Sequence, residues 1–203
     1  MTVLSDKRLK EYLFRRKLVV HPILSLDQIK GSRIDLRLSN IIYRIKHFER
    51  PAFDPKKATP DVEYGEEHNI QFDKGVVLQI GDFAIAPLFE RIRLPDDLVA
   101  RLDGRSSLGR LGIIVHATAG GIDPGFSGQL TCELSNLGKV PVVLYPLMRV
   151  ASLTVEEMTE KSDMPYYARK GQFDKKYGKE LGTSLQSDYE FAMKVLNKVQ
   201  ENI

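Results

Sequence analysis

Short β-rich pieces separated by turn residues fill most of the chain, and this spacing constrains the fold more than any other feature. Between residues 76 and 155, glycine, proline, aspartate or asparagine stands at most of the breaks, and little helical spacing lies between the pieces. The pieces read VVLQI, FAIAPL, RIRL, LVARL, IIVHA, QLTCEL, VPVVLY and RVASLTV. Parallel strands need long and usually helical crossovers, so this pattern predicts a mainly β, antiparallel barrel or sandwich.

Helical spacing begins close to the N-terminus. Ser5 precedes DKRLKEYLFRRK, in which Leu9 and Tyr12 share one face, and this predicts a capped helix. Ser25 and Gln28 form a capping box in SLDQIKG, which predicts a second, short helix. After it the apolar residues alternate, so IDLRLSNIIYRI is expected to be strand.

A chain of 203 residues suits one domain with a single core, and we expect that domain to span residues 1–203. Residues 165–185 are polar and contain glycines, which is typical of a surface segment. Ser187 and Glu190 then form a capping box ahead of an apolar stripe, and this predicts a terminal helix over 187–202.

Composition excludes several classes of partner. The net charge of +3 is mild and no block of Lys and Arg interleaved with aromatic residues occurs, so we expect a small anionic ligand and no nucleic-acid polymer. No stretch approaches the ~20 apolar residues of a membrane span, so no membrane partner is expected. The N-terminus lacks the apolar region of a signal peptide, and Cys132 is the single cysteine; we therefore expect a cytoplasmic protein.

Residues 104–136, GRSSLGRLGIIVHATAGGIDPGFSGQLTCELSN, combine seven glycines with two arginines, paired serines and two acids, Asp123 and Glu133. Glycine-rich turns let backbone N–H groups approach an anion, and arginine adds a bidentate donor, so the segment indicates phosphate binding. A site for phosphate alone gains nothing from negative charge. The two acids therefore indicate a second task, either activating water or holding a metal.

Three familiar motifs almost fit this chain and fail. GRSSLGRL has the glycine spacing of a P-loop, but Arg110 replaces the lysine and Leu111 replaces the metal-binding hydroxyl. A nucleophile elbow needs one residue fewer between Ser106 and Gly109. The HFE run at 47–49 matches the first half of a zinc-deaminase motif, but the P-C-x-x-C half is absent from the sequence.

The runs GRSSLGRLG, HATAGGIDPGFSG and LTCELSN resemble the signature of the dCTP deaminase family, within the dUTPase superfamily. VLSDKRLKEYL and SRIDLRLSN resemble the opening helix and first strand of that family, and LPDDLVARLDGRSS resembles the approach to its central motif. The resemblance runs from Val3 to about Gly182 and leaves out the terminal helix and residues 51–68. It implies a dUTPase-like antiparallel β-barrel, a distorted jelly roll, that forms a homotrimer with its sites at subunit interfaces.

The resemblance also implies catalytic roles. Glu133 matches the general base that takes a proton from the water attacking C4 of cytosine, without zinc. Ser106 and Arg110 match residues that position this water and stabilise charge developing on the base. Asp123 matches the acid that binds the deoxyribose 3′-hydroxyl and, in related dUTPases, orients a hydrolytic water.

Further positions match the substrate-binding residues of the family. Arg105 and Ser107 match its phosphate-binding turn, and the Ala119 carbonyl matches one that orients the attacking water. Tyr166 and Lys176 match residues that close over the sugar and the triphosphate, so the resemblance implies that residues 165–185 cover the nucleotide. The glutamine expected four positions after Lys176 is Glu180, whose charge repels phosphate. The expected substrate-binding set is Arg105, Ser107, Leu108, Gly109, Ala119, Thr131, Cys132, Tyr166, Lys176 and Glu180.

The implied reaction is the hydrolytic deamination of dCTP, with Mg²⁺ bridging the triphosphate and held mainly by phosphates and waters. Further expected ligands are dUTP and, as a feedback inhibitor, dTTP. Family members that stop at dUTP carry H-R before I-D, whereas Gly120 and Gly121 stand here, which resembles the bifunctional sequences that continue to dUMP. A deaminase that releases dUTP, a plain dUTP diphosphatase and a non-catalytic nucleotide sensor stay open as alternatives.

Overall fold

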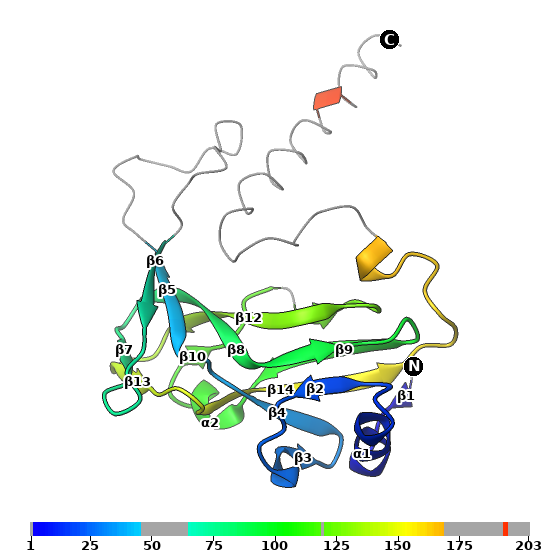
Figure 1. Ribbon diagram of the computed structural model, residues 1–203. Coiled ribbons are helices and arrows are strands. Elements are labelled where there is room, and N and C mark those ends of the chain that lie inside the picture. Colours follow the sequence, from blue (N-terminus) through cyan, green and yellow to red (C-terminus); the bar gives the residue numbers. More distant parts are fainter. Residues whose placement is uncertain (1, 46–64, 119, 169–192, 195–203) are drawn as a thin grey trace. The chain divides into compact units, whose positions relative to one another are not determined.

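A computed structural model of the protein describes residues 2–45, 65–118, 120–168 and 193–194 (Figure 1). The chain divides into two units, of which the first spans Met1–Arg44 and Glu67–Arg169 and is called the β unit below. The predicted nucleotide-covering tail beyond residue 168 lies outside the described residues. The predicted terminal helix also lies outside them, except for Met193 and Lys194, which are helical.

One sheet of the β unit contains six strands in the order β11-β9-β14-β4-β3, with β1 pairing on β14. Its strands are β1 Thr2–Val3, β3 Ile29–Lys30, β4 Arg33–Arg37, β9 Leu98–Gly104, β11 Gly121–Ile122 and β14 Arg149–Glu157. Strand β14 lies at the centre and pairs with both β4 and β9. Residues of β4 and β9, which are far apart in the sequence, therefore lie close to one another on the two sides of β14.

The second sheet has the order β10-β12-β8-β5-β6, with β2 pairing on β8. Its strands are β2 Val19–His21, β5 Ile41–Ile45, β6 Gly65–Asn69, β8 Phe83–Arg93, β10 Ile113–Ile114 and β12 Ser127–Asn136, and a separate ribbon joins β7 Val76–Leu78 to β13 Val142–Leu144. Every strand pair whose register the structure describes is antiparallel. The prediction of a mainly β, antiparallel fold is confirmed.

Aliphatic side chains from both sheets form one buried cluster. Its largest fully buried members are Leu9, Leu18, Ile34, Leu36, Leu38, Ile42, Leu78, Leu88, Ile92, Leu94, Leu98 and Leu108. Alternation along the strands supplies most of them, because every second side chain of a strand points to the same face.

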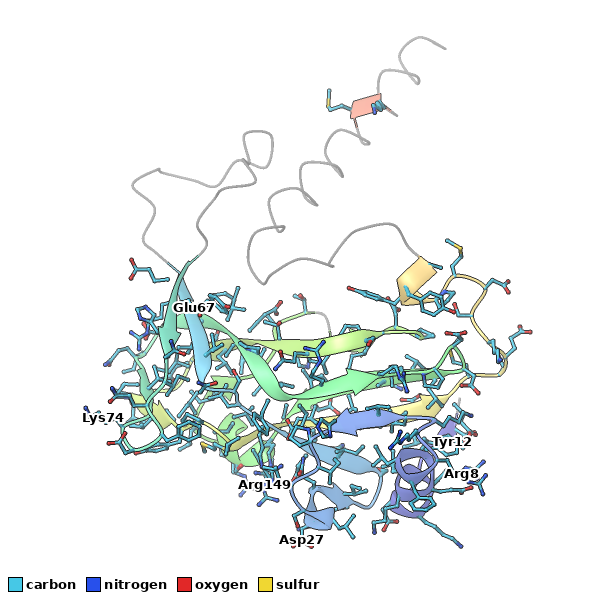
Figure 2. The ribbon with its side chains drawn as sticks, viewed as in Figure 1. Arg8, Tyr12, Asp27, Glu67, Lys74 and Arg149 are labelled. Carbon is cyan, nitrogen blue, oxygen red and sulfur yellow. The ribbon has the colours of Figure 1, made fainter. Side chains whose placement is uncertain are left out.

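The predicted N-terminal helix is confirmed as α1, Asp6–Phe14. Its N-cap Ser5 accepts a hydrogen bond from the backbone N–H of Arg8, and Leu9 and Tyr12 are buried against the sheets. The guanidinium of Arg8 lies 4.6 Å from the centre of the Tyr12 ring, and both side chains are labelled in Figure 2. The helix ends earlier than its apolar spacing predicted, because Arg16 takes a left-handed φ of 56°.

The second predicted helix is a single 3₁₀ turn, η1, Leu26–Gln28. Ser25 caps it as predicted by accepting from the N–H of Asp27, but Gln28 does not complete a capping box. The buried Gln28 amide donates instead to the Asp35 carbonyl (2.9 Å) and to Glu90 Oε1 (3.0 Å). The prediction was wrong here because a buried amide needs partners inside the protein, and the sheets supply them.

FAIAPL and RIRL, expected as two strands, form the single strand β8. Its register against β12 shifts between Gln129 and Thr131, and Pro87 lies opposite Thr131 at that irregularity. A bulge tolerates proline because the ladder hydrogen bond is already interrupted there. Glu90 lies on the inward face of β8 together with Leu88 and Ile92, and it accepts from the backbone N–H of Arg37 at 2.8 Å. Burial raises the pKa of Glu90, although its bonds to Arg37 act in the opposite direction.

Candidate functional site

Strand β12 directs alternate side chains to the core and away from it, and this decides which predicted residues can meet a ligand. Cys132 and Leu134 are buried, whereas Thr131 and Glu133 are half-buried on the opposite face. Ile85 of β8 lies directly across the ladder from Glu133. The predicted general base therefore lies on the accessible face of a strand in the interior of its sheet.

The carboxylate of Glu133 is oriented by the segment that follows β10. The Glu133 N–H donates to the carbonyl of Val115 at 3.0 Å, and Oε2 accepts from the N–H of Ala117 at 3.1 Å. Among the described residues no hydrogen bond reaches Oε1 of this carboxylate. Glu133 is thus held by one oxygen while the other is available to accept a proton, which a general base requires.

Cys132 was expected to bind substrate, but its side chain lies in the core with no exposed surface. Burial, followed by the charge of neighbouring Glu133, raises the pKa of this thiol to about 12. A thiol of such high pKa carries no thiolate near neutral pH and is not a nucleophile. Only the backbone of Cys132 is therefore available to a ligand on the Glu133 face of β12.

The predicted phosphate-binding turn forms a short helix, α2, Ser106–Gly109, directly after β9. Leu108 is buried and anchors the turn, while Ser106, Ser107 and Arg110 are exposed. The turn after α2 is fixed by Gly112, which has a φ of 86° and lies so close to Gly138 that a Cβ would fall 2.3 Å from its Cα. Two hydroxyls and a guanidinium are thus presented to solvent on a rigid support.

Arg105, the first residue of this turn, is partly buried. Its backbone N–H donates to the carbonyl of Val150 at 3.3 Å, and its Nη1 donates to the carbonyl of Arg149 at 3.4 Å. Its Nε lies 3.9 Å from Oδ1 of Asp35. Sequence reasoning gave no role to Asp35 or Arg149, because the contact depends on the order of three strands rather than on any local motif.

Asp123 and Tyr166 lie together at the turn between β11 and β12. The Tyr166 N–H donates to the carbonyl of Pro124 at 2.8 Å, and the Tyr166 ring meets Phe126 edge to face at 5.3 Å between ring centres. The short helix η3, Tyr166–Ala168, thereby packs on the turn that contains Asp123. The structure brings together the two residues that the resemblance assigned to the sugar.

Other predicted residues are not joined within one chain. Among the described residues, no hydrogen bond or ion pair connects Glu133 with Ser106 or Arg110. Ala119, Lys176 and Glu180 lie outside the described residues, so their predicted roles stay predictions.

Sequence reasoning also gave no role to His116, which lies next to the segment that holds Glu133. Its Nδ1 is buried and makes no hydrogen bond to the described residues. Gly120 packs on this ring, since a Cβ at 120 would fall 2.8 Å from Cε1 of His116. At Gly121, by contrast, a Cβ would meet nothing within 4 Å.

A groove of about 720 Å³ lies elsewhere on the β unit, between the end of α1, β2 and β8. Arg16, His21, Arg91 and Arg93 line it together with apolar side chains, and none of the predicted site residues does. Within the described ranges, no group of three or more His, Cys, Asp or Glu is placed to bind a metal. The helices in those ranges are too short or too polar to span a membrane.

The fold and the site define the class of the protein: a mainly β, antiparallel protein with an arginine-bearing glycine-rich turn and a carboxylate on an accessible strand face. Residues 3–158 match the family model described as dCTP deaminase-like, and the chain belongs to that family. The family resemblance of the three sequence runs is thereby confirmed.

Individual relatives agree with this assignment. A Dictyoglomus turgidum protein named "dCTP deaminase, dUMP-forming" is 47% identical over 194 residues, which cover 95% of this chain and 98% of that protein. A Haloarcula marismortui protein named "dCTP deaminase" is 42% identical over 193 residues, covering 93% of this chain and 97% of that protein. The crystal structure of 2′-deoxycytidine 5′-triphosphate deaminase from Agrobacterium tumefaciens matches with a TM-score of 0.61 and 28% identity. That match covers 77% of this chain and 48% of the Agrobacterium chain.

Proposed function

We propose that this protein hydrolyses dCTP to a deoxyuridine nucleotide and ammonia without zinc, and that it continues to dUMP and diphosphate. The observation that carries the proposal is Glu133, held through Oε2 by Ala117 on the accessible face of β12. Its support is the 47% identity to the Dictyoglomus protein named "dCTP deaminase, dUMP-forming". Phosphate binding alone needs no acid at this position, which argues against a plain diphosphatase or a sensor.

In the first step, Glu133 accepts a proton from a water molecule whose oxygen attacks C4 of the cytosine ring. The bond between C4 and the exocyclic nitrogen breaks, and the proton passes to that nitrogen, so dCTP and water give dUTP and ammonia. Ser106 and Arg110 position the water and stabilise charge on the ring. Preorganised donors of this kind act without rearranging during the reaction, which makes them effective.

Arg105 and Ser107 bind the triphosphate, since a guanidinium and a hydroxyl at an exposed turn are suited to phosphate oxygens. Mg²⁺ prefers oxygen ligands and keeps several waters, so it would be held by the phosphate oxygens and waters while Arg105 and Ser107 hold the phosphates. When bound, it would neutralise phosphate charge. Asp123 and Tyr166, joined through the β11–β12 turn, hold the sugar.

In the second step, a water attacks the α-phosphorus of dUTP and the bond to the bridging oxygen breaks, giving dUMP and diphosphate. Asp123 orients this water. The support is Gly121, where the absence of a side chain and the open space around it leave room beside the Asp123 turn. The alternative is a deaminase that releases dUTP, and the relative from Haloarcula named "dCTP deaminase" is the observation that favours it.

We further infer a homotrimer in which one copy supplies Glu133 and a neighbouring copy supplies Ser106 and Arg110. Glu133 has no hydrogen bond to either residue within the described part of one chain, which supports this arrangement. The proposed ligands include dUTP and, as an inhibitor, dTTP. The proposed location is the cytoplasm, where a single free thiol such as Cys132 stays reduced.

The test is incubation of the purified protein with dCTP and Mg²⁺, measuring ammonia and separating dUTP from dUMP. Glu133→Gln should lower the rate of ammonia release about 10² to 10⁴-fold, because the amide has the same shape and cannot accept the proton. Binding of dCTP, measured by calorimetry on the same variant, should change little. Ammonia release within tenfold of the parent would remove Glu133 from the mechanism.

A further inference from the structure

A half-buried carboxylate lies between two arginines beside the phosphate-binding turn. Asp35 Oδ2 accepts from Arg149 Nη1 at 3.0 Å, and Asp35 Oδ1 lies 3.9 Å from Arg105 Nε. The Asp35 side chain is 18% exposed, against 31% for Arg105 and 38% for Arg149. Arg149 is labelled in Figure 2, at the beginning of β14.

Three strands of one sheet create this contact. Strand β4 carries Asp35, β14 begins with Arg149, and β9 leads directly into Arg105. Because β14 pairs with both β4 and β9, the three side chains meet although they are far apart in sequence. A register shift between Arg149 and Ala151 interrupts the ladder at this point. The strand order therefore brings these three side chains together without the help of a ligand.

The Arg105 side chain is restrained at two of its nitrogens. Nε faces Asp35, and Nη1 donates to the carbonyl of Arg149. A guanidinium has five N–H donors, so the remaining donors stay available to an anion at Ser106 and Ser107. An arginine that is already ordered loses less conformational freedom when it binds phosphate.

The group formed by Asp35, Arg105 and Arg149 keeps a net positive charge, so it still attracts an anion. Two guanidinium groups share one carboxylate, which leaves one net positive charge. Arg37, which lies across the ladder from Arg149, is paired separately with the buried Glu90. In the part of the chain that the structure describes, the cations that meet the Asp35 carboxylate are therefore Arg105 and Arg149, and Arg37 is not one of them.

We propose that Asp35 is a positioning residue that holds Arg105 at the phosphate-binding turn, so that affinity for the triphosphate depends on a side chain that does not touch it. The inference rests on the proposed function for the identity of the ligand. The direction in which Asp35→Asn changes the Kd is informative, because removing a negative charge near a polyanion site by itself strengthens long-range attraction. Asp35→Asn therefore strengthens binding if charge dominates and weakens it if positioning dominates.

The test is a double-mutant cycle of dCTP binding, measured by calorimetry in the Glu133→Gln background so that no turnover occurs. Asp35→Asn should raise the Kd for dCTP about tenfold or more, as displaced binding groups do. In the presence of Arg105→Ala the same change should no longer raise the Kd and should leave it unchanged or slightly lower, because Asp35 acts through Arg105. Additive effects of the two changes, or an unchanged or lower Kd for Asp35→Asn, would overturn the proposal.

Two further variants separate positioning from other causes. Asp103→Asn removes the same charge from neighbouring β9, where Asp103 lies opposite Ser152, and should leave the Kd unchanged or slightly lower. Asp35→Glu keeps the charge but moves the carboxylate by one methylene, and should give an intermediate Kd even if Asp35→Asn folds poorly. A Kd for Asp35→Glu equal to the parent would count against the proposal.

The same samples distinguish failure of this inference from failure of the proposed function. If the parent releases ammonia and the effects of Asp35→Asn and Arg105→Ala on the Kd are additive, the proposed deaminase function stands and the positioning role of Asp35 is wrong. A non-additive cycle without ammonia release by the parent keeps Asp35 as the positioning residue of a triphosphate site and removes the deaminase.

Discussion

Two neighbouring residues on β12 differ completely in their surroundings. Glu133 is half-buried beside Ala117, and Cys132 is fully buried in the core. Strand alternation alone produces this contrast, so a signature run such as LTCELSN contains both core and site residues. Matching a family motif residue by residue does not separate the two kinds, whereas the alternation does.

The buried thiol of Cys132 predicts a loss of stability at high pH. Its pKa is about 12 in the folded protein, against an ordinary value of 9.0, so the unfolded chain releases this proton first. Stability from the protonated thiol is full below pH 9 and is lost as the pH rises toward 12. At pH 10 the parent should have lost about 1 kcal/mol relative to Cys132→Ala.

The measurement is the free energy of unfolding of both proteins at pH 7, 9 and 10, from denaturant titrations with a reducing agent present. Tyrosine and lysine titrate equally in the two proteins, so only the difference between them is interpreted. Parallel pH curves for the parent and Cys132→Ala would contradict the prediction.

The two adjacent glycines before Ile122 make a test of the second reaction possible. A side chain at Gly120 would meet His116 and the Leu102 carbonyl, whereas a Cβ at Gly121 meets nothing within 4 Å. Only position 121 can therefore accept the arginine of enzymes that release dUTP. Gly121 lies opposite Arg101, whose charge is already paired with Glu156, so we expect Gly121→Arg to fold.

Gly121→Arg should retain ammonia release and shift the main product from dUMP to dUTP, because the side chain occupies the space beside the Asp123 turn. Early product ratios, measured by chromatography with contaminating pyrophosphatase excluded, check this. Gly121→Gln is the matched control for length without charge. If dUMP stays the main product of Gly121→Arg, open space at position 121 does not determine the second reaction.

At the scale of the element, the sequence predicted well what depends on neighbouring residues. Helix α1 and its Ser5 cap follow from a local pattern, and they form as predicted. The short helix at Ser25 was only partly right, because Gln28 Oε1 accepts from the N–H of Leu24 instead of Ser25, and its amide donates to partners on β4 and β8. Local patterns carry no information about such distant partners.

Strand β8 illustrates the same limit for strands. The charged Glu90, with Phe89 before it, divides its sequence into two apparent pieces, and Pro87 lies inside the first of them. The bulge between Gln129 and Thr131 interrupts the ladder at the proline, and alternation along β8 turns the acid inward to Gln28 and Arg37. The strand was therefore predictable in type, and its continuity was not.

The candidate site shows how far a motif extends. The motif named Asp123, Tyr166 and Glu133 as site residues, and the structure adds that Tyr166 packs on the turn that contains Asp123 and that Glu133 is half-buried on β12. It could not indicate Asp35, which reaches Arg105 only because β14 lies between β4 and β9. The order of strands in a sheet is a property of the whole fold. Sequence reasoning therefore misses residues such as Asp35, which contact a site residue from a neighbouring strand.

At the scale of the whole molecule, the proposed catalytic residues lie in two separate sets. Glu133 belongs to the sheet of β8 and β12, whereas Ser106 and Arg110 follow β9 of the other sheet. No hydrogen bond joins the two sets in the described part of the chain. A homotrimer of identical copies meets head to tail, which places one surface of each copy against a different surface of the next. The proposed site then combines the Glu133 set of one copy with the Arg110 set of its neighbour.

Mixed trimers provide the test of this arrangement. Glu133→Gln and Arg110→Ala should each be inactive alone, and co-expression in equal amounts should restore ammonia release. A shared site is intact only when the copy that supplies Glu133 is the Arg110→Ala chain and its neighbour is the Glu133→Gln chain. This occurs at one of the three sites of every mixed trimer, so about one third of the sites in the purified mixed trimers should be active. Differently tagged subunits, purified through both tags, verify that the trimers are mixed. If each site lies within one copy, every copy carries one defect, and the mixed trimers should be as inactive as either parent variant.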